Sequence, residues 1–200
     1  MSDKRIVLLS NPGRFSGPAV KRALTEGGAI VLGCAPLGDE AAGVLPADLA
    51  MVSAREPAAI VDEVVRSHGQ IDVLINNDAF PAIRAKVEEA DPGDMRAGLE
   101  VMVEAPYALA AAVVPGMKAR RAGKIVFVTS ATPFHGLPNY SMYVTARGAA
   151  NAMALTFAKE LGPHNIQVNA VAPNYVENPD YFPSEVVGDP DTLKKIVRPI

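Results

Sequence analysis

Three polar side chains in the second half of the sequence have the types and the spacing that proton transfer requires. Tyr143 and Arg147 lie four residues apart, so they share one face if residues 141–161 form a helix. A phenol is a weak base at its ordinary pKa of about 10, and a neighbouring guanidinium favours its phenolate form. Ser130 could hold the oxygen of an alcohol while Tyr143 removes the proton. We therefore predict that Ser130, Tyr143 and Arg147 are catalytic residues.

The elements that would position these residues alternate along the chain. Short continuous apolar runs predict strands at residues 5–10, 29–34, 71–75, 124–129 and 166–171. Apolar residues at helical spacing predict helices at residues 17–26, 56–67, 94–121 and 141–161, with a bend near Pro106 and a short helical patch at residues 191–197. Continuous apolar strands between helices are typical of a parallel sheet covered on both faces. We therefore predict an α/β fold, a doubly wound Rossmann-like parallel sheet, in a single domain over residues 1–200.

In a doubly wound sheet the functional site lies beyond the carboxyl ends of the strands. The first such segment, residues 10–17, stands where dinucleotide-binding proteins carry a glycine-rich turn that lets a pyrophosphate approach the backbone. Asn11 and Phe15 occupy the positions of its first two glycines, with Gly17 as the third. The Phe15 ring would fill the space that a phosphate or nicotinamide needs. Alternatively, the turn is shifted and the ring points into the core.

Two further strand ends carry groups that suit binding. Asp78 follows the strand at residues 71–75, where a carboxylate usually has a partner or a function, and the alternative is a solvated loop acid. The loop after residue 171 contains prolines and aromatic residues. Its backbone N–H groups around Tyr175 and Val176 could form a small anion site. The alternative for this loop is a lid over a cofactor.

These features together resemble the short-chain dehydrogenase/reductase superfamily across essentially the whole chain. The resemblance is carried by Asn76-Asn77, Ser130, Tyr143 and residues 165–173. Dehydrogenases of that superfamily have a glycine-rich first turn and a lysine four residues after the tyrosine, whereas this chain has Phe15 and Arg147. Both departures are similar to the pattern of the halohydrin dehalogenases. Segments 77–80, 129–134 and 173–175 also resemble that family, while Ser10 replaces its usual threonine.

The resemblance implies an enzyme that converts vicinal haloalcohols to epoxides and releases halide. In reverse, it implies epoxide opening by small anions such as azide, cyanide or nitrite. Neither a nicotinamide nor a metal is expected as a cofactor. Arginine is planar and permanently charged, so Arg147, with no ribose to bind, only has to tune Tyr143, and Asp78 is implied to support it.

The resemblance also assigns two groups of binding residues. The implied halide or nucleophile site consists of Phe15, Pro173, Asn174, Tyr175, Val176 and Phe182. The implied substrate pocket consists of Phe80, Pro133, Phe134 and Tyr181.

Composition narrows the partners and the location. The 200-residue chain is 49% hydrophobic and has a formal net charge of −3 with no basic stripe, which argues against nucleic acid. Residues 6–9 are too few apolar residues for a signal peptide, and no stretch approaches the length of a membrane span, so we expect a cytoplasmic protein with no membrane partner. Cys34, the single cysteine, excludes an internal disulfide and is interpreted as a small buried hydrophobic residue. Three scattered histidines suggest no metal site.

Alanine-rich helices at residues 94–121 and 141–161 suit close packing between subunits, and superfamily members assemble in this way. We therefore expect a homodimer or homotetramer, although these faces could simply cover the sheet. Superfamily members also continue with another helix and a final parallel strand. We expect this chain to lack both, which leaves an unpaired strand edge.

Two other functions remain open from the sequence. One is an NAD(P)-dependent oxidoreductase with an unusual first turn, which would bind NADH or NADPH saturably. The other is a non-catalytic binding module on the same scaffold, which would release no halide and bind no cofactor while staying folded.

Overall fold

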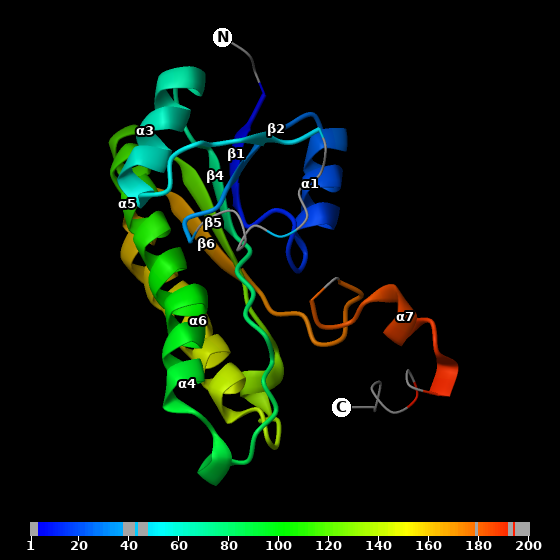
Figure 1. Ribbon diagram of the computed structural model, residues 1–200. Helices are drawn as coiled ribbons and strands as arrows, with labels where there is room; N and C mark the ends of the chain where they lie inside the picture. The colour runs from blue at the N-terminus through cyan, green and yellow to red at the C-terminus, as the bar shows by residue number, and fades with distance from the viewer. Residues whose placement is uncertain (1–3, 38–42, 44–47, 179, 192–193, 195–200) are drawn as a thin grey trace.

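A computed structural model describes residues 4–37, 43, 48–178, 180–191 and 194. Its centre is a six-stranded parallel sheet with the strand order β3-β2-β1-β4-β5-β6 (Figure 1). The strands are β1 (Ile6–Ser10), β2 (Ile30–Cys34), β3 (Ala50–Met51), β4 (Val73–Asn76), β5 (Gly123–Val128) and β6 (Ile166–Val171). The α-helices are α1 (Gly17–Glu26), α3 (Pro57–His68), α4 (Pro92–Leu99), α5 (Ala105–Arg120), α6 (Ser141–Leu161) and α7 (Ser184–Val187). The predicted doubly wound, Rossmann-like α/β fold is confirmed.

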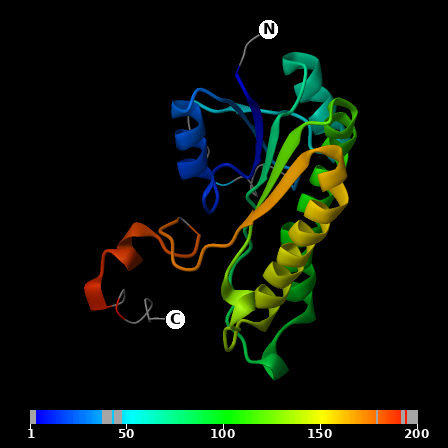
Figure 2. The same cartoon turned by 180° about the vertical axis from the view of Figure 1, so that it is seen from behind.

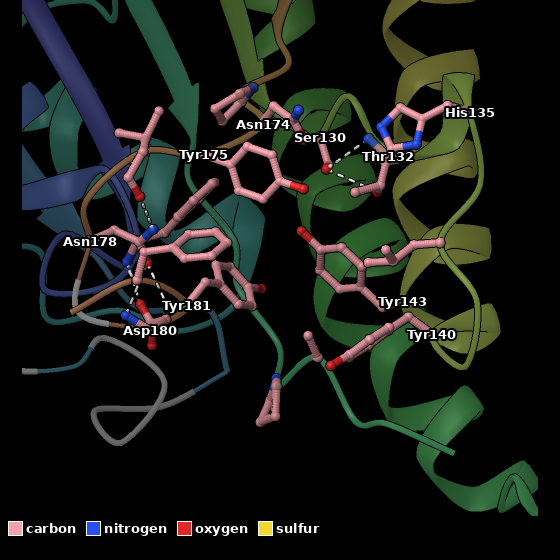
Figure 3. Close-up of a pocket in the computed structure, with 17 residues that line it drawn as sticks. Ser130, Thr132, His135, Tyr140, Tyr143, Asn174, Tyr175, Asn178, Asp180 and Tyr181 are labelled. Carbon is pink, nitrogen blue, oxygen red and sulfur yellow. Dashed lines mark hydrogen bonds between the residues drawn. The ribbon is translucent and has the colours of Figure 1, made fainter. Parts of the chain in front are cut away.

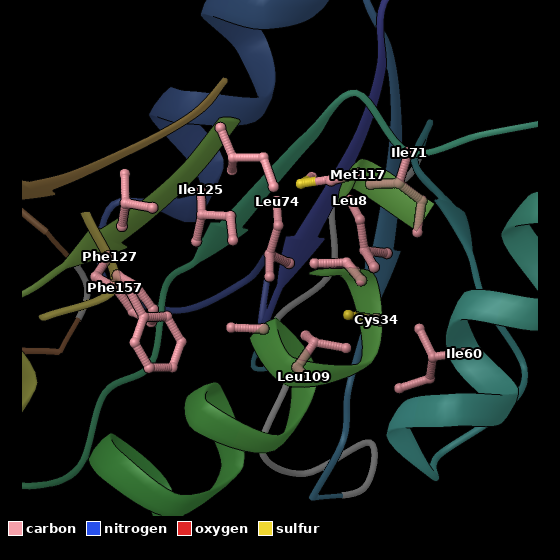
Figure 4. Close-up of a cluster of buried hydrophobic side chains, with 14 of the residues drawn as sticks. Leu8, Cys34, Ile60, Ile71, Leu74, Leu109, Met117, Ile125, Phe127 and Phe157 are labelled. Atoms are coloured by element: carbon pink, nitrogen blue, oxygen red, sulfur yellow. The ribbon is translucent and has the colours of Figure 1, made fainter. Parts of the chain in front are cut away.

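Alternating side chains of the strands build one core on each face of the sheet. Figures 1 and 2 show α3, α5 and α6 on one face and α1 on the other. Leu8 and Leu74 point into the core beneath α3 and α5 together with Cys34, which is buried as predicted (Figure 4). Burial raises the pKa of the Cys34 thiol. Val7 and Leu9 point into the second core, beneath α1, and each buried aliphatic side chain contributes roughly 2 kcal/mol.

Most predicted elements lie within two residues of their observed bounds. Helices α1 and α6 begin and end where predicted. Helix α3 ends at His68 because Gly69 follows with a φ of 88°, which glycine adopts without a side-chain clash. Strand β3 was not predicted, because its two residues are too few for a periodic signal. Most of the helical patch predicted at residues 191–197 lies outside the described residues.

The long helical region predicted at residues 94–121 consists of three consecutive helices. A π-helix at Glu100–Glu104 separates α4 from α5, and Pro106 lies in the first turn of α5. Proline has no N–H, and its ring crowds the carbonyl four residues earlier. A widened turn directly before Pro106 relieves that crowding. The irregularity predicted near Pro106 is therefore present as a π-helical turn.

The expectation that no stretch approaches a membrane span is wrong for this region. Pro92–Arg120 forms 29 helical residues with an 18-residue window of mean hydropathy 1.5, enough to cross a membrane by length and composition alone. One face of α5 packs on the sheet, where Leu109, Val113 and Met117 are buried. In total 33% of the window is buried. Because the core helix of a sheet domain passes the same test, this helix is weak evidence for a membrane span.

Strand β6 forms one edge of the sheet in the described part of the chain. Ile166 and Val168 are buried in the core that α6 covers, whereas Gln167, Asn169 and Val171 on the opposite side are exposed. Among the described residues, none covers that side of β6.

We predict that Gly17→Ala destabilises the fold strongly. A Cβ atom at residue 17 would overlap the Pro12 carbonyl oxygen and lie 2.9 Å from Asn77 Nδ2. Backbone cannot yield as a flexible side chain does, so urea unfolding should show a loss of roughly 3 kcal/mol. Gly162→Ala is the matched control, because a Cβ atom there meets nothing within 4 Å. Equal stability of the two variants would contradict this account of the turn.

Candidate active site

Four loops meet at the carboxyl edge of the sheet, where the sequence predicted the site. Strands β1, β4, β5 and β6 are neighbours, and the register pairs Asn76 with Phe127 and Val128 with Val171. The strands therefore end at similar levels and their loops converge. A cavity of about 550 Å³ opens between these loops and the start of α6 (Figure 3).

Every backbone N–H group of residues 14–17, in the turn after β1, already has an acceptor inside the protein. The four amides donate, in order, to the carbonyl oxygen of Asn11 (3.0 Å), the carboxylate of Asp180, Oδ1 of Asn77 (3.1 Å) and the carbonyl oxygen of Arg14 (2.8 Å). In dinucleotide-binding proteins the N–H groups at this place bind the pyrophosphate. Here two of them are bound by side chains of other loops, and the turn binds the other two itself.

Phe15 lies in this turn with a positive φ of 43°, which costs a non-glycine residue on the order of 1 kcal/mol. Its ring is buried and meets Tyr181 edge-on, with the ring centroids 5.3 Å apart. The guanidinium carbon of Arg147 lies 5.3 Å from the centroid of the same ring. The ring therefore points into the core beneath α1, as the alternative interpretation expected, and it also forms part of the cavity wall.

Asp180 holds the loop after β6 against this turn. One carboxylate oxygen accepts the Phe15 amide, and the other lies 3.0 Å from Arg14 Nη1. Asn178, which is buried, orders the same loop, because its Oδ1 accepts the amides of Asp180 at 3.0 Å and of Tyr181 at 2.8 Å. The turn and the loop are thus joined as one unit on this side of the cavity.

The segment from Pro173 to Val176 forms another wall of the cavity. The Pro173 carbonyl oxygen accepts the Ala131 amide at 3.0 Å, which ties the segment to the loop after β5. The Tyr175 ring meets Phe182 edge-on at 5.5 Å. In the part of the chain that the structure describes, the amides of Tyr175 and Val176 donate to no acceptor. These are the two N–H groups from which the sequence predicted an anion site.

Arg147 is buried, with 1% of its surface exposed, and it contacts three residues of the cavity wall. Its Nη1 donates to the Val128 carbonyl oxygen at 3.1 Å, and its Nη2 donates to the Tyr181 hydroxyl at 3.2 Å. Its guanidinium carbon lies 5.4 Å from the ring centroid of Tyr143. Burial by itself would lower the pKa of Arg147, but attraction to Tyr181 and Tyr143 outweighs it and raises that pKa. Arg147 therefore keeps its charge inside the protein, between two phenols.

Asp78 is buried two residues after β4 and is not the solvated loop acid of the alternative interpretation. Its Oδ1 accepts Ser10 Oγ at 3.1 Å and Asn11 Nδ2 at 2.6 Å. Burial raises the pKa of Asp78 to about 7, although those hydrogen bonds and the charge of Arg147 act in the opposite direction. Attraction links Asp78 to Arg147, while among the described contacts no hydrogen bond joins the two. The interaction between Asp78 and Arg147 in this structure is electrostatic.

Ser130 and Tyr143 bring hydroxyl groups to the cavity from two different elements (Figure 3). Ser130 follows β5, and Tyr143 lies in the first turn of α6. The Ser130 hydroxyl lies 3.0 Å from the Thr132 hydroxyl and accepts the Thr132 amide at 3.2 Å. Asn151 of α6 donates to the Ser130 carbonyl oxygen at 3.1 Å. Helix α6 therefore carries Tyr143 and Arg147 and also fixes the backbone of Ser130.

Comparison with known protein families accounts for this arrangement. Residues 20–184 match the family described as short chain dehydrogenase. This chain belongs to the short-chain dehydrogenase family. A curated relative, the 3-oxoacyl-[acyl-carrier-protein] reductase FabG of Thermotoga maritima, is 36% identical over 124 residues. That match covers 60% of this chain and 48% of FabG, so it spans about half the length of that relative.

Two solved structures that are similar to this chain are dehalogenases. One, called "Dehalogenation enzyme", is 42% identical with a TM-score of 0.87, over 96% of this chain and 81% of that one. The other, halohydrin dehalogenase HheC bound to ethyl (2S)-oxiran-2-ylacetate, is 31% identical with a TM-score of 0.84, over 96% and 80% of the two chains. The predicted similarity to halohydrin dehalogenases is confirmed.

Most of the site residues predicted for this short-chain dehydrogenase line the cavity. They are Phe15, Ser130, Tyr143, Pro173, Asn174, Tyr175, Val176, Tyr181 and Phe182. Arg147 and Asp78 lie behind this wall, where they can act on Tyr143 but are not among the lining residues.

Three residues predicted for the substrate pocket do not line the cavity. Phe134 is 76% exposed, because it ends a 3-10 turn that directs it to solvent. Pro133 faces α6, where a Cβ atom added to Gly148 would lie 3.6 Å from it. The Phe80 ring lies near Gly98 of α4, and the backbone of Phe80, rather than its ring, contributes to the site by binding the Tyr181 hydroxyl. The residue types of Phe80 and Phe134 led us to predict an aromatic wall of the pocket, but a residue type does not show where its side chain points.

Several polar residues of the cavity were missed. Thr132 could have been found, since a hydroxyl two residues after Ser130 is well placed for a local hydrogen bond. Tyr140 lies three residues before Tyr143 and so shares its face. His135, one of the three scattered histidines, is exposed and lines the cavity. Asn178 and Asp180 lie in an irregular loop, where no periodicity predicts direction.

Asp78 should make stability depend on pH in a predictable direction. Its folded-state pKa of about 7 lies above the ordinary 3.8, so the folded protein keeps a proton that the unfolded chain releases between about pH 4 and 7. The stability from that proton is present at low pH and is lost as pH rises toward 7. From pH 5 to 8, the free energy of unfolding of the wild type should fall by on the order of 2 kcal/mol relative to Asp78→Asn, measured with urea. Parallel pH dependence of the two proteins would contradict the raised pKa.

Proposed function

We propose that this chain converts vicinal haloalcohols to epoxides with release of halide, without a nicotinamide, and opens epoxides with small anions in reverse. The observation that carries the proposal is the turn after β1. Its amides at residues 14–17 already have acceptors inside the protein, and the Phe15 ring forms part of the cavity wall. The similarity to two dehalogenase structures supports the same conclusion.

Ser130 and Tyr143 bind the hydroxyl group of the haloalcohol, and Tyr143 removes its proton as the general base. Arg147 favours the phenolate that accepts this proton, and Asp78 interacts electrostatically with Arg147 from behind the cavity wall. The alkoxide oxygen then forms a bond to the neighbouring carbon while the carbon–halogen bond breaks. Because the displacement is intramolecular and in line, positioning of the substrate supplies much of the rate acceleration.

The halogen departs with the bonding electron pair into the segment Pro173–Val176. The amides of Tyr175 and Val176 bind the halide there, and Phe15, Asn174 and Phe182 wall the pocket. Tyr143 passes its proton to solvent, so the products are an epoxide, a halide ion and a proton. In reverse, an anion in the same pocket attacks the epoxide carbon and Tyr143 returns the proton to the alkoxide.

Halide release from a chlorinated or brominated vicinal alcohol, with purified protein and no added cofactor, tests the proposal. Tyr143→Phe should lower the rate at least roughly 100-fold, because it removes the general base and leaves the ring in place. Tyr107→Phe is the matched control, since Tyr107 lies on the outer face of α5 and is 52% exposed. No release from several such alcohols, or full activity of Tyr143→Phe, would overturn the proposal.

An NAD(P)-dependent oxidoreductase is the second candidate, because the curated relative FabG is named as a reductase. Titration with NADH and NADPH, followed by nucleotide fluorescence, separates the two candidates. We expect no saturable binding at low micromolar concentration, since residues 14–17 offer no unbound amide to a phosphate. Saturable binding would favour the oxidoreductase. A folded protein with neither activity would point to a binding module.

We also propose that two or four copies of this chain assemble through the outer faces of α5 and α6. Tyr107 is 52% exposed and Leu155 is 62% exposed on these helices. A cavity of about 150 Å³ lies between the helices and is lined mainly by apolar residues, among them Ala111, Val114 and Phe157. Small alanine side chains allow two such faces to approach closely, and a two-fold axis would bury both at once.

Leu155→Asp should shift the native mass toward a monomer, because a carboxylate would be buried at the centre of the contact. Because Leu155 is exposed, the variant should keep its fold, and circular dichroism checks this directly. Val87→Asp serves as control, since Val87 is 77% exposed on the 3-10 helix Val87–Glu89, outside both helices. A monomeric wild type, or an unchanged mass for Leu155→Asp, would overturn this assembly.

A further inference from the structure

In the proposed reaction the guanidinium of Arg147 acts on Tyr143. A second phenol, that of Tyr181, binds the same guanidinium. Tyr181, from the loop after β6, accepts Arg147 Nη2 at 3.2 Å. Its ring meets Tyr143 edge-on at 5.5 Å and Phe15 edge-on at 5.3 Å. Tyr181 therefore contacts the proposed base Tyr143, the neighbouring guanidinium of Arg147 and the ring of Phe15.

The Tyr181 hydroxyl has a fixed direction. It donates to the Phe80 carbonyl oxygen at 2.7 Å and accepts the Phe80 amide at 3.2 Å, so its lone pairs face Arg147 and the Phe80 amide. Burial raises the pKa of Tyr181 to about 12, which keeps this phenol neutral near pH 7. A neutral acceptor orients the guanidinium without neutralising it.

No negatively charged group among the described residues has a hydrogen bond to Arg147. Within the described residues, its hydrogen bonds go to the Val128 carbonyl oxygen and to Tyr181, and no carboxylate bonds to it. Asp78 attracts it, but its Oδ1 is bound by Ser10 and Asn11. The buried positive charge of Arg147 therefore has no hydrogen-bonded carboxylate among the described residues and can act on the Tyr143 phenolate.

We propose that Tyr181 is a positioning residue: its hydroxyl holds the guanidinium of Arg147 against Tyr143 and so sets the pH at which Tyr143 can act as a base. The inference deepens the proposed function and rests on it. Without the hydroxyl, the Phe80 carbonyl oxygen loses its donor and Arg147 Nη2 loses its acceptor, so the guanidinium is no longer held and can turn. Such a turn takes the charge away from Tyr143 and disfavours its phenolate.

Several other groups face Tyr143 and titrate or carry charge. They are Tyr140 beside α6, Asp94 in α4, Asp78 after β4, His135 after β5, and Tyr175 and Asp180 after β6, the last paired with Arg14. None of these described side chains has a hydrogen bond to Arg147, whereas Tyr181 has one, so a variant of Tyr181 separates its role from theirs.

Tyr181→Phe keeps the ring contacts and removes the hydroxyl. We expect the midpoint of the pH–rate profile for halide release to rise by about one unit, which lowers the rate roughly ten-fold below the midpoint and restores it at high pH. The KM for the haloalcohol should change less than about two-fold. Tyr140→Phe is the matched control: it also removes a phenol that lines the cavity, and it should leave the midpoint where it is.

A second measurement needs no substrate. The pH titration of phenolate ultraviolet absorbance, taken as the difference between each protein and its Tyr143→Phe counterpart, reports Tyr143 alone. That midpoint should rise in Tyr181→Phe and stay unchanged in Tyr140→Phe. If no protein releases halide, the proposed function fails while this titration still decides on Tyr181. An unchanged Tyr143 midpoint, or a rate lowered equally at every pH, would reduce Tyr181 to a packing residue and overturn the inference.

Discussion

The chemistry open to this site depends on what the backbone N–H groups of the turn after β1 bind. At the amino end of α1 such groups attract phosphate, but here the Asp180 carboxylate and the Asn77 side chain already accept two of them. A hydrogen bond to a charged group contributes roughly 1.5 to 3 kcal/mol. A nucleotide phosphate would have to displace an acceptor that is attached to the protein itself. The loops after β4 and β6 thus supply the acceptors for these two amides of the turn.

The same loop determines the surroundings of Arg147. A buried guanidinium loses several kcal/mol of hydration, and the Val128 carbonyl oxygen, the Tyr181 hydroxyl and two ring faces offset that loss. A cation over an aromatic ring gains up to about 2 kcal/mol when desolvated. None of these partners is a carboxylate, so they stabilise the guanidinium without cancelling its charge. A planar, delocalised cation suits this place, because it can meet two rings and two acceptors at once, which an ammonium cannot do as well.

The sheet and the central residues of the site could be predicted because both follow from repeating geometry. Continuous apolar runs gave the strands, and the four-residue spacing of Tyr143 and Arg147 gave their shared face on α6. Asp180 and the direction of Phe134 could not be predicted, because an irregular loop and a 3-10 turn have no period that would orient a side chain. Phe15 shows where prediction from the sequence stops. The sequence showed that a phenylalanine replaces a glycine in the turn, but it could not show that the ring packs in the core and also lines the cavity.

The similarity to reductases and the proposed dehalogenation do not conflict, because the proposal depends on the turn that contains Phe15 as well as on the part of the chain that matches the family. The family match begins at residue 20, so the turn at residues 10–17 lies outside it. What the matched part shares is a sheet and a helix that present a tyrosine at the carboxyl edge, and such a scaffold does not by itself define a reaction. The reaction follows from what occupies the space in front of that tyrosine. Phe15, Tyr181 and Asp180 gather there, and the proposed dehalogenation rests on this arrangement.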